Sequence, residues 1–169
     1  MKVTILCEGR INKSPERELC DLYQQRINLI KQSGFSNFLI KQSTSKEIEK
    51  IIKKKDINTK ILILSEIGKI YSSVEFTKFI QKFLDTHIKE LYLLIGKPEG
   101  VTINTENCEK ISLSKMTFPH SLSRVILCEQ FYRCATIITK HPYHKYYKIK
   151  NMRLFIRLTL IFLILLVPS

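Results

Sequence analysis

The sequence of 169 residues has few glycines, and none of them builds a nucleotide-binding loop. The five glycines are too scattered to form a Gly-x-Gly-x-x-Gly fingerprint or a phosphate-binding P-loop. The sequence therefore excludes a Rossmann-type dinucleotide or methyltransferase loop and a P-loop nucleotide hydrolase. These glycines are Gly9, Gly34, Gly68, Gly96 and Gly100.

The five cysteines form no Cys-x-x-Cys pair and no group with histidine. This distribution argues against a zinc site and against a disulfide framework. We expect no metal, and we expect a reducing, cytoplasmic environment. Met1 leads directly into a strand-like segment, so no signal peptide is predicted. The cysteines are Cys7, Cys20, Cys108, Cys128 and Cys134.

Acidic residues are scarce, with 15 against 28 basic residues, which gives a formal net charge of +13. A strongly basic chain favours a polyanionic partner, and nucleic acid is the commonest one. The alternative is that the high lysine content only reflects a codon-biased genome. The run from Lys53 to Lys55 is interpreted as the solvated end of a helix rather than a site.

Apolar runs alternate with amphipathic segments along the chain. Strands are predicted at residues 3–7, 35–40, 60–64, 91–95 and 111–113. Helices are predicted to start at Ser14-Pro15, at capping boxes formed by Thr44 with Glu47 and Ser72 with Glu75, and at Pro119. This alternation predicts an α/β fold with a mainly parallel sheet and helices on both faces. We expect a single domain over residues 1–146.

Three motifs follow one another in the second half of the chain. Leu-Leu-Ile-Gly-Lys-Pro-Glu-Gly (Leu93 to Gly100) ends an apolar run, and Leu-Ser-Lys-Met-Thr-Phe-Pro-His (Leu113 to His120) joins a short strand to a helix. His-Pro-Tyr-His-Lys (His141 to Lys145) follows that helix. Two loops at strand ends next to a helix are typical of a ligand crevice in an open α/β sheet.

In these three motifs the sequence resembles the 23S rRNA pseudouridine N3-methyltransferases, small bacterial members of the SPOUT superfamily. The resemblance covers about residues 1–145 and implies a C-terminal trefoil knot that holds S-adenosylmethionine. It also implies a homodimer that acts on 23S rRNA within the assembled ribosome. Periodicity alone predicts an ordinary doubly wound sheet, so the knot depends on the resemblance.

The resemblance implies a set of cofactor-binding residues in the loops after three strands. The sequence departs from the family at Ser65, where an aspartate is usual, and at Lys97, where a second glycine is usual. We expect a glycine at position 97 to bind the cofactor at least as well as lysine. The expected cofactor contacts are Leu64, Gly96, Leu113, Ser114, Lys115, Met116, Thr117 and Phe118.

Methylation at N3 of a pyrimidine requires that nitrogen to lose its proton, and each pKa unit costs about 1.4 kcal/mol. Histidine is the side chain best suited to such proton transfer near neutral pH. Glu129 and Arg133 are four residues apart and are expected to pair. The predicted catalytic residues are His120, Arg124, Arg133, Tyr143 and His144, with His141 as a further candidate base.

Two other functions compete with this one. The protein could be a non-catalytic basic RNA-binding or ribosome-associated protein in which the changes at Ser65 and Lys97 disable the cofactor site. It could also attach to a membrane through its tail, residues 147–169, where Leu158 to Val167 is almost entirely apolar. That segment is shorter than the roughly 20 residues that a spanning helix needs. We expect the tail to be dispensable, and membrane contact is not favoured.

Overall fold

The computed structural model describes residues 1–8, 13–97, 105 and 108–144. Its strands are β1 (Lys2–Glu8), β2 (Asn37–Ser43), β3 (Thr59–Ile70), β4 (Glu90–Ile95) and β5 (Glu109–Ser112). They form one sheet in the order β2-β1-β4-β3-β5, and all its pairs of neighbouring strands are parallel. The predicted parallel α/β architecture is confirmed.

Four α-helices connect or follow these strands in the described residues. They are α1 (Pro15–Leu29), α2 (Ser45–Lys53), α3 (Ser73–Asp85) and α4 (His120–Ile138), and a short 3₁₀ turn, η1 (Lys31–Ser33), follows α1. Ser14, Thr44 and Ser72 cap the first three helices, and both predicted capping boxes are present. None of the helices in this part of the chain is long and apolar enough to cross a membrane.

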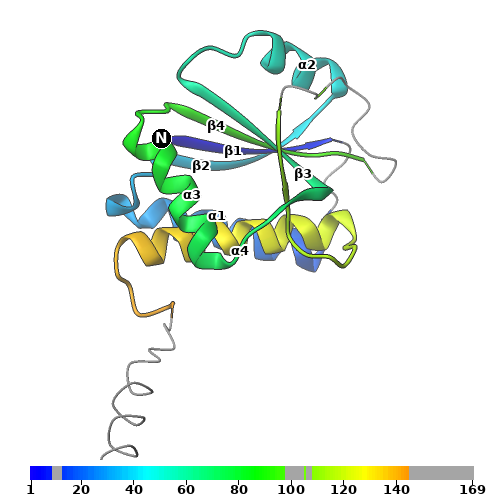
Figure 1. Ribbon diagram of the computed structural model, residues 1–169. Coiled ribbons are helices and arrows are strands. Elements are labelled where there is room, and N and C mark those ends of the chain that lie inside the picture. The colour runs from blue at the N-terminus through cyan, green and yellow to red at the C-terminus, as the bar shows by residue number, and fades with distance from the viewer. Residues whose placement is uncertain (9–12, 98–104, 106–107, 145–169) are drawn as a thin grey trace, which may run out of the picture.

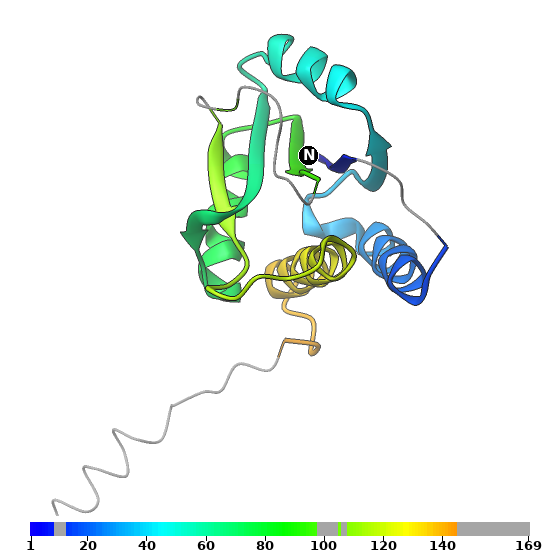
Figure 2. The ribbon, with the colours of Figure 1, turned by 90° about the vertical axis from the view of Figure 1, so that its right-hand side faces the viewer.

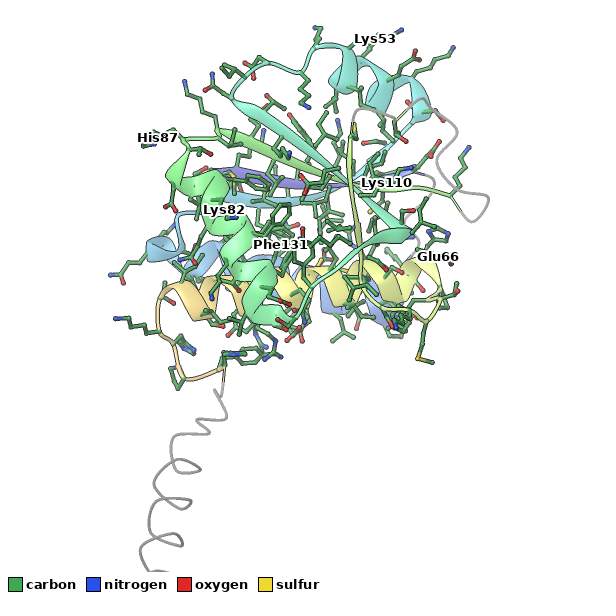
Figure 3. The ribbon with its side chains drawn as sticks, viewed as in Figure 1. Lys53, Glu66, Lys82, His87, Lys110 and Phe131 are labelled. Atoms are coloured by element: carbon green, nitrogen blue, oxygen red, sulfur yellow. The ribbon has the colours of Figure 1, made fainter. Side chains whose placement is uncertain are left out.

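The helices cover the two faces of the sheet unequally. Helices α1, α3 and α4 pack against one face, whereas α2 lies alone on the other (Figures 1 and 2). Phe131 of α4 is fully buried in the larger core, where its ring meets those of Phe35, Phe38 and Phe76 at centroid distances of 5.4 to 5.9 Å (Figure 3). On the other face, Ile48 of α2 is buried against the sheet.

Strand β3 is longer than the sequence predicts. The expected strand ends at Leu64, but β3 continues to Ile70 because its pairing with β5 resumes after a register shift between Leu64 and Lys69. Gly68 makes this possible, since a Cβ atom there would lie 2.3 Å from the carbonyl carbon of Ile111. Apolar periodicity cannot reveal such a close backbone approach.

Smaller differences occur at the ends of two other strands. Strand β2 begins at Asn37 rather than Phe35, and β5 covers Glu109–Ser112 rather than residues 111–113.

The connection from β4 to β5 includes residues 98–104 and 106–107, which lie outside the described residues. The tail at 145–169 also lies outside them. The trefoil knot therefore stays a prediction.

Candidate active site

A cleft of about 540 Å³ lies at the carboxyl ends of β4 and β5, beside the irregular middle of β3. It is bounded by β3 residues from Ile63 to Ile67, by Gly96 after β4 and by the loop between β5 and α4. Parallel strands direct their carboxyl ends to one edge of a sheet, and crevices at that edge are the usual ligand sites of open α/β folds. Seven of the eight predicted cofactor residues line this cleft: Leu64, Gly96, Leu113, Ser114, Met116, Thr117 and Phe118. Lys115 is exposed and lies outside the lining.

Hydrogen bonds within the loop between β5 and α4 fix its shape beside the cleft. The Ser112 hydroxyl donates to the carbonyl of Ser114 at 2.8 Å, and the Ser114 hydroxyl accepts from the amide of Met116 at 3.0 Å. These bonds lie within the loop itself and hold the turn that forms this wall of the cleft.

Several cleft residues were not predicted from the sequence. Glu66 and Lys110 add charged groups of opposite sign to the lining, and both are labelled in Figure 3. Glu66 lies in the part of β3 that was expected to be a loop, and Lys110 precedes the motif that carries the resemblance. The alternation of side chains along β5 indicates that Lys110 and Ser112 share a face, a signal that could have identified Lys110.

Lys97 also lines the cleft, and it forms an ion pair with Glu8 at the end of β1. Its Nζ atom lies 3.9 Å from Oε1 of Glu8, whose side chain is only 1% exposed. The same carboxylate accepts a 2.5 Å hydrogen bond from the hydroxyl of Ser45, the first residue of α2. The Lys97 side chain therefore links the edge of the cleft to β1 and α2.

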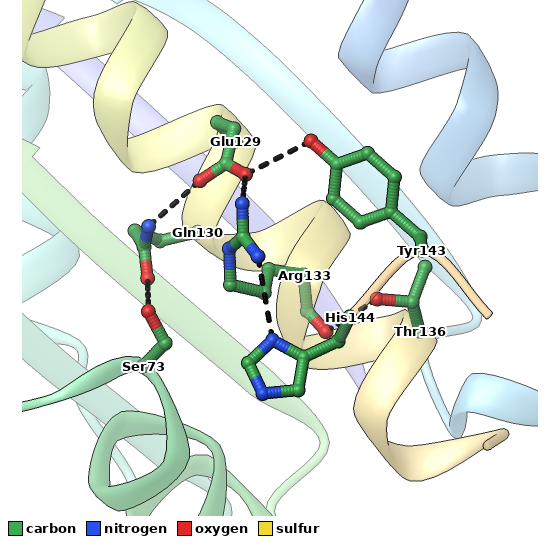
Figure 4. Close-up of polar contacts among 7 residues, drawn as sticks. All are labelled: Ser73, Glu129, Gln130, Arg133, Thr136, Tyr143 and His144. Carbon is green, nitrogen blue, oxygen red and sulfur yellow. Dashed lines mark hydrogen bonds and ion pairs between the residues drawn. The ribbon is translucent and has the colours of Figure 1, made fainter. Parts of the chain in front are cut away.

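A polar cluster lies on α4 and the segment that follows it (Figure 4). Arg133 pairs with Glu129 as predicted, and its second terminal nitrogen lies 3.3 Å from Nδ1 of His144. The Tyr143 hydroxyl donates to Oε1 of Glu129 at 3.0 Å, and the Arg133 guanidinium lies 5.1 Å from the Tyr143 ring centroid. These contacts bring together three of the predicted catalytic residues: Arg133, Tyr143 and His144.

Burial and the hydrogen bond to Glu129 raise the pKa of Tyr143 well above its usual value. The phenol therefore keeps its proton at neutral pH and serves as a donor rather than a base. Glu129 accepts a further hydrogen bond of 2.7 Å from the side-chain amide of Gln130, which in turn accepts one of 2.8 Å from the hydroxyl of Ser73. The carboxylate is thus held in place from three sides.

The predicted catalytic residues do not all lie together in the structure. His120, the first residue of α4, lines the cleft, but Arg133 is 13 residues further along the same helix. At a rise of about 1.5 Å per residue, that separation is roughly 20 Å. Arg124 lies elsewhere again, near Ser14 and Cys20 at the start of α1.

Comparison with known proteins identifies the family. A model of the family described as predicted SPOUT methyltransferases matches residues 1–144. The chain belongs to the SPOUT methyltransferase family. This finding confirms the predicted family and its enzyme class.

Three relatives of this SPOUT methyltransferase carry the name Ribosomal RNA large subunit methyltransferase H. The protein of Phocaeicola vulgatus is 41% identical over 155 residues, which cover 85% of this chain and 99% of the relative. The protein of Mycoplasmopsis synoviae is 38% identical over 153 residues, or 86% and 100% of the two chains. The protein of Christiangramia forsetii is 34% identical over 155 residues, or 85% and 99%.

SPOUT methyltransferases use S-adenosylmethionine, and the cleft fits a molecule of that size and chemistry. Its volume lies within the range of about 300 to 1,000 Å³ that is typical of small-ligand pockets. Apolar side chains such as Leu64, Leu113 and Phe118 can enclose the faces of an adenine, while the Ser114 and Thr117 hydroxyls offer polar contacts. In the described part of the chain, no group of three or more histidine, cysteine, aspartate or glutamate side chains could hold a metal ion.

Proposed function

We propose that this SPOUT methyltransferase transfers a methyl group from S-adenosylmethionine to N3 of a pseudouridine in the 23S rRNA of the large ribosomal subunit. We further propose that it acts on the assembled ribosome in the cytoplasm, as a homodimer with the knotted C-terminal topology that the resemblance implies. The observation that carries the proposal is the cleft. Residues nominated from the motifs line it, in a chain whose matched segment spans 99 to 100% of relatives named as large-subunit rRNA methyltransferases.

When bound, S-adenosylmethionine supplies an activated methyl group. The chain has to position the target base and exclude water. It also has to accept the N3 proton or stabilise the deprotonated base. His144 is the group that we assign to the proton because its ring lies against Arg133. Tyr143 keeps its own proton, so its role is to orient the carboxylate of Glu129 through their hydrogen bond.

A second subunit explains how these residues reach the cofactor cleft. Glu129 and Arg133 lie on a stripe of α4 that begins with Leu122, which is 40% exposed. On α1, the helix packed beside α4, Leu19 and Leu22 are 43% and 38% exposed. Exposed apolar side chains around polar functional groups are typical of an interface. We propose that this surface forms the dimer interface and brings His144 of one subunit to the cleft of the other.

Mass spectrometry of large-subunit rRNA from a strain that lacks this protein tests the function. The proposal predicts that one methylated pseudouridine present in the parent strain is unmethylated in this strain, and that expression of the protein restores the methyl group. Calorimetry with S-adenosylmethionine distinguishes the proposed enzyme from a non-catalytic RNA-binding protein. Absence of binding at millimolar ligand would favour the non-catalytic function.

A further inference from the structure

The outer side of α2 carries a stripe of lysines that the cofactor cleft does not use. Between positions 41 and 55 the chain has six lysines and only two acidic residues. The other helices are closer to neutral, since α1 has three acidic and two basic residues and α3 has two of each. The stretch around α2 therefore contributes +4 to the net charge of +13, more than α1 or α3.

The two glutamates of α2 do not neutralise this stripe. Glu47 is committed to the capping box, where it accepts from the Thr44 amide at 2.8 Å, and Glu49 pairs with Lys53 at 2.7 Å. Lys46, Lys50 and Lys54 are exposed, and they make no ion pair with any other described residue. Figure 3 shows Lys53 on this helix, on the side of the sheet away from α3 and α4.

The spacing of these three lysines aligns them on the helix. They recur every four residues, which places them on one side over about 12 Å at about 1.5 Å per residue. Lys46 and Lys50 lie two residues before and after Ile48, the side chain that is buried against the sheet, so they point away from it. Like charges four residues apart destabilise a helix, and Lys46 in the first turn opposes the helix dipole, although Lys50 in the last turn favours it. The dipole therefore accounts for Lys50 but not for Lys46.

The stripe starts beside the cleft. Ser45, the residue before Lys46, donates its hydroxyl to Glu8, and Glu8 pairs with Lys97 in the cleft lining. A polyanion with one residue in the cleft would therefore meet Lys97 first and then Lys46, Lys50 and Lys54 along α2. Among the described residues, no other helix lies on this side of the sheet (Figures 1 and 2).

We propose that the stripe Lys46, Lys50 and Lys54 is a phosphate-docking surface for the RNA strand that flanks the target nucleotide. This inference rests on the proposed function, and for Lys54 it replaces the interpretation of the run from Lys53 to Lys55 as a solvated helix end. Lysines that contact phosphates position a nucleic acid without reading its sequence. The stripe thus contributes affinity and orientation, and the cleft contributes the chemistry.

The test compares two full-length variants with equal loss of charge. The first is Lys46→Gln with Lys50→Gln and Lys54→Gln, which keeps good helix formers on α2. The control is Lys78→Gln with Lys82→Gln and Lys89→Gln, three exposed lysines on or after α3. Binding of oligouridine RNA is measured over a range of salt, together with S-adenosylmethionine affinity and methyl transfer to ribosomes from a strain that lacks the protein.

For the α2 variant, the slope of log affinity against log salt should fall by about 2, because each lost phosphate contact removes about 0.7 to 0.9. Its KM for ribosomes should rise at least tenfold while kcat and cofactor affinity stay as in the wild type. The α3 control should change none of these. Equal slopes and equal KM values for the two variants would overturn the proposal.

A membrane partner gives a different result. If phosphatidylserine vesicles bind the wild type but not the α2 variant, while RNA and ribosome binding are the same for both, the stripe is a membrane site and the proposal fails. If the wild type transfers no methyl group to ribosomes, the proposed function fails. The salt slopes with oligouridine still decide the docking surface in that case.

Discussion

The Lys97 ammonium, in the lining of the proposed cofactor cleft, lies 3.9 Å from the buried carboxylate of Glu8. From the sequence, lysine at position 97 was a reason to expect a weakened cofactor site. The ion pair gives this side chain a partner outside the space enclosed by Leu64, Leu113 and Phe118. An intact cofactor site is therefore compatible with lysine at position 97.

Replacing Lys97 with glycine should leave S-adenosylmethionine affinity equal to or better than that of the wild type. Glycine removes a side chain from the edge of the cleft. The loss should not weaken binding, because the Lys97 ammonium is paired with Glu8 rather than directed at the apolar walls. Isothermal titration calorimetry measures the effect, with Lys115→Gly as a control in an exposed residue outside the cleft lining. A tenfold loss of affinity in Lys97→Gly alone would show that the lysine contacts the cofactor.

Replacing His144 with alanine should reduce kcat for methyl transfer by about 100-fold or more, the usual contribution of a general acid or base. The dissociation constant for S-adenosylmethionine should change less than twofold, because His144 is assigned to the proton of the target base and not to the cofactor. His141→Ala compares the other candidate base, which is exposed and accepts a hydrogen bond from the amide of Tyr143. Equal losses of cofactor binding and of transfer would contradict this division of roles.

Mixed dimers test whether each site draws on both subunits. A His144→Ala chain and a chain with a blocked cleft, Leu113→Arg, should each be inactive alone. After mixing and exchange of subunits, about a quarter of wild-type activity should return, because half of the dimers are mixed and each has one intact site. Absence of any recovery, with mixed dimers verified by native mass spectrometry, would place the complete site within one subunit.

Substitution of Gly68 by alanine should lower the free energy of unfolding by about 2 kcal/mol or more and lower the melting temperature by about 5 °C. The added methyl group would lie 2.3 Å from the Ile111 backbone and would separate β3 from β5. Ile67→Ala is the control because Ile67 is 82% exposed in the same segment. Similar melting temperatures for Gly68→Ala and Ile67→Ala would show that β5 moves freely to accept the methyl group.

Stability should fall as the pH rises from about 9 to about 12. Burial raises the pKa of the Cys7 and Cys134 thiols to about 12 each. Below pH 9 both states keep these protons, but above it the unfolded chain releases them first, so each thiol lowers the free energy of unfolding by up to about 1.4 kcal/mol per pH unit. Urea titrations at pH 8, 9, 10 and 11 measure this slope, which should be shallower in a Cys7→Ala, Cys134→Ala double variant.

The sequence predicted the parallel α/β architecture because it depends on local signals. Apolar runs mark the buried strands, and the caps at Ser14, Thr44 and Ser72 mark the helix starts. It missed the second half of β3, which exists because Gly68 lets two backbones approach across 43 residues of sequence. Local periodicity contains no information about such a contact.

The candidate site was predicted in part. The motifs identified most of the cleft because loops after parallel strands converge at one edge of the sheet. The 13 residues between His120 and Arg133 on the predicted helix already implied their separation, whereas the position of Arg124 beside α1 depends on how the two helices pack. Glu66 was missed because it lies in the irregular part of β3 that was expected to be a loop, and Lys110 was missed because it precedes the motif on β5.

The central claim is tested most directly by reconstitution. Purified full-length protein, S-adenosylmethionine and ribosomes from a strain lacking the protein are incubated, and the large-subunit rRNA is mapped by mass spectrometry. The account predicts one methyl group per large subunit, at N3 of a pseudouridine, and none with the His144→Ala variant. Methylation of another atom or nucleotide, or no methylation by a protein that binds S-adenosylmethionine, would contradict it.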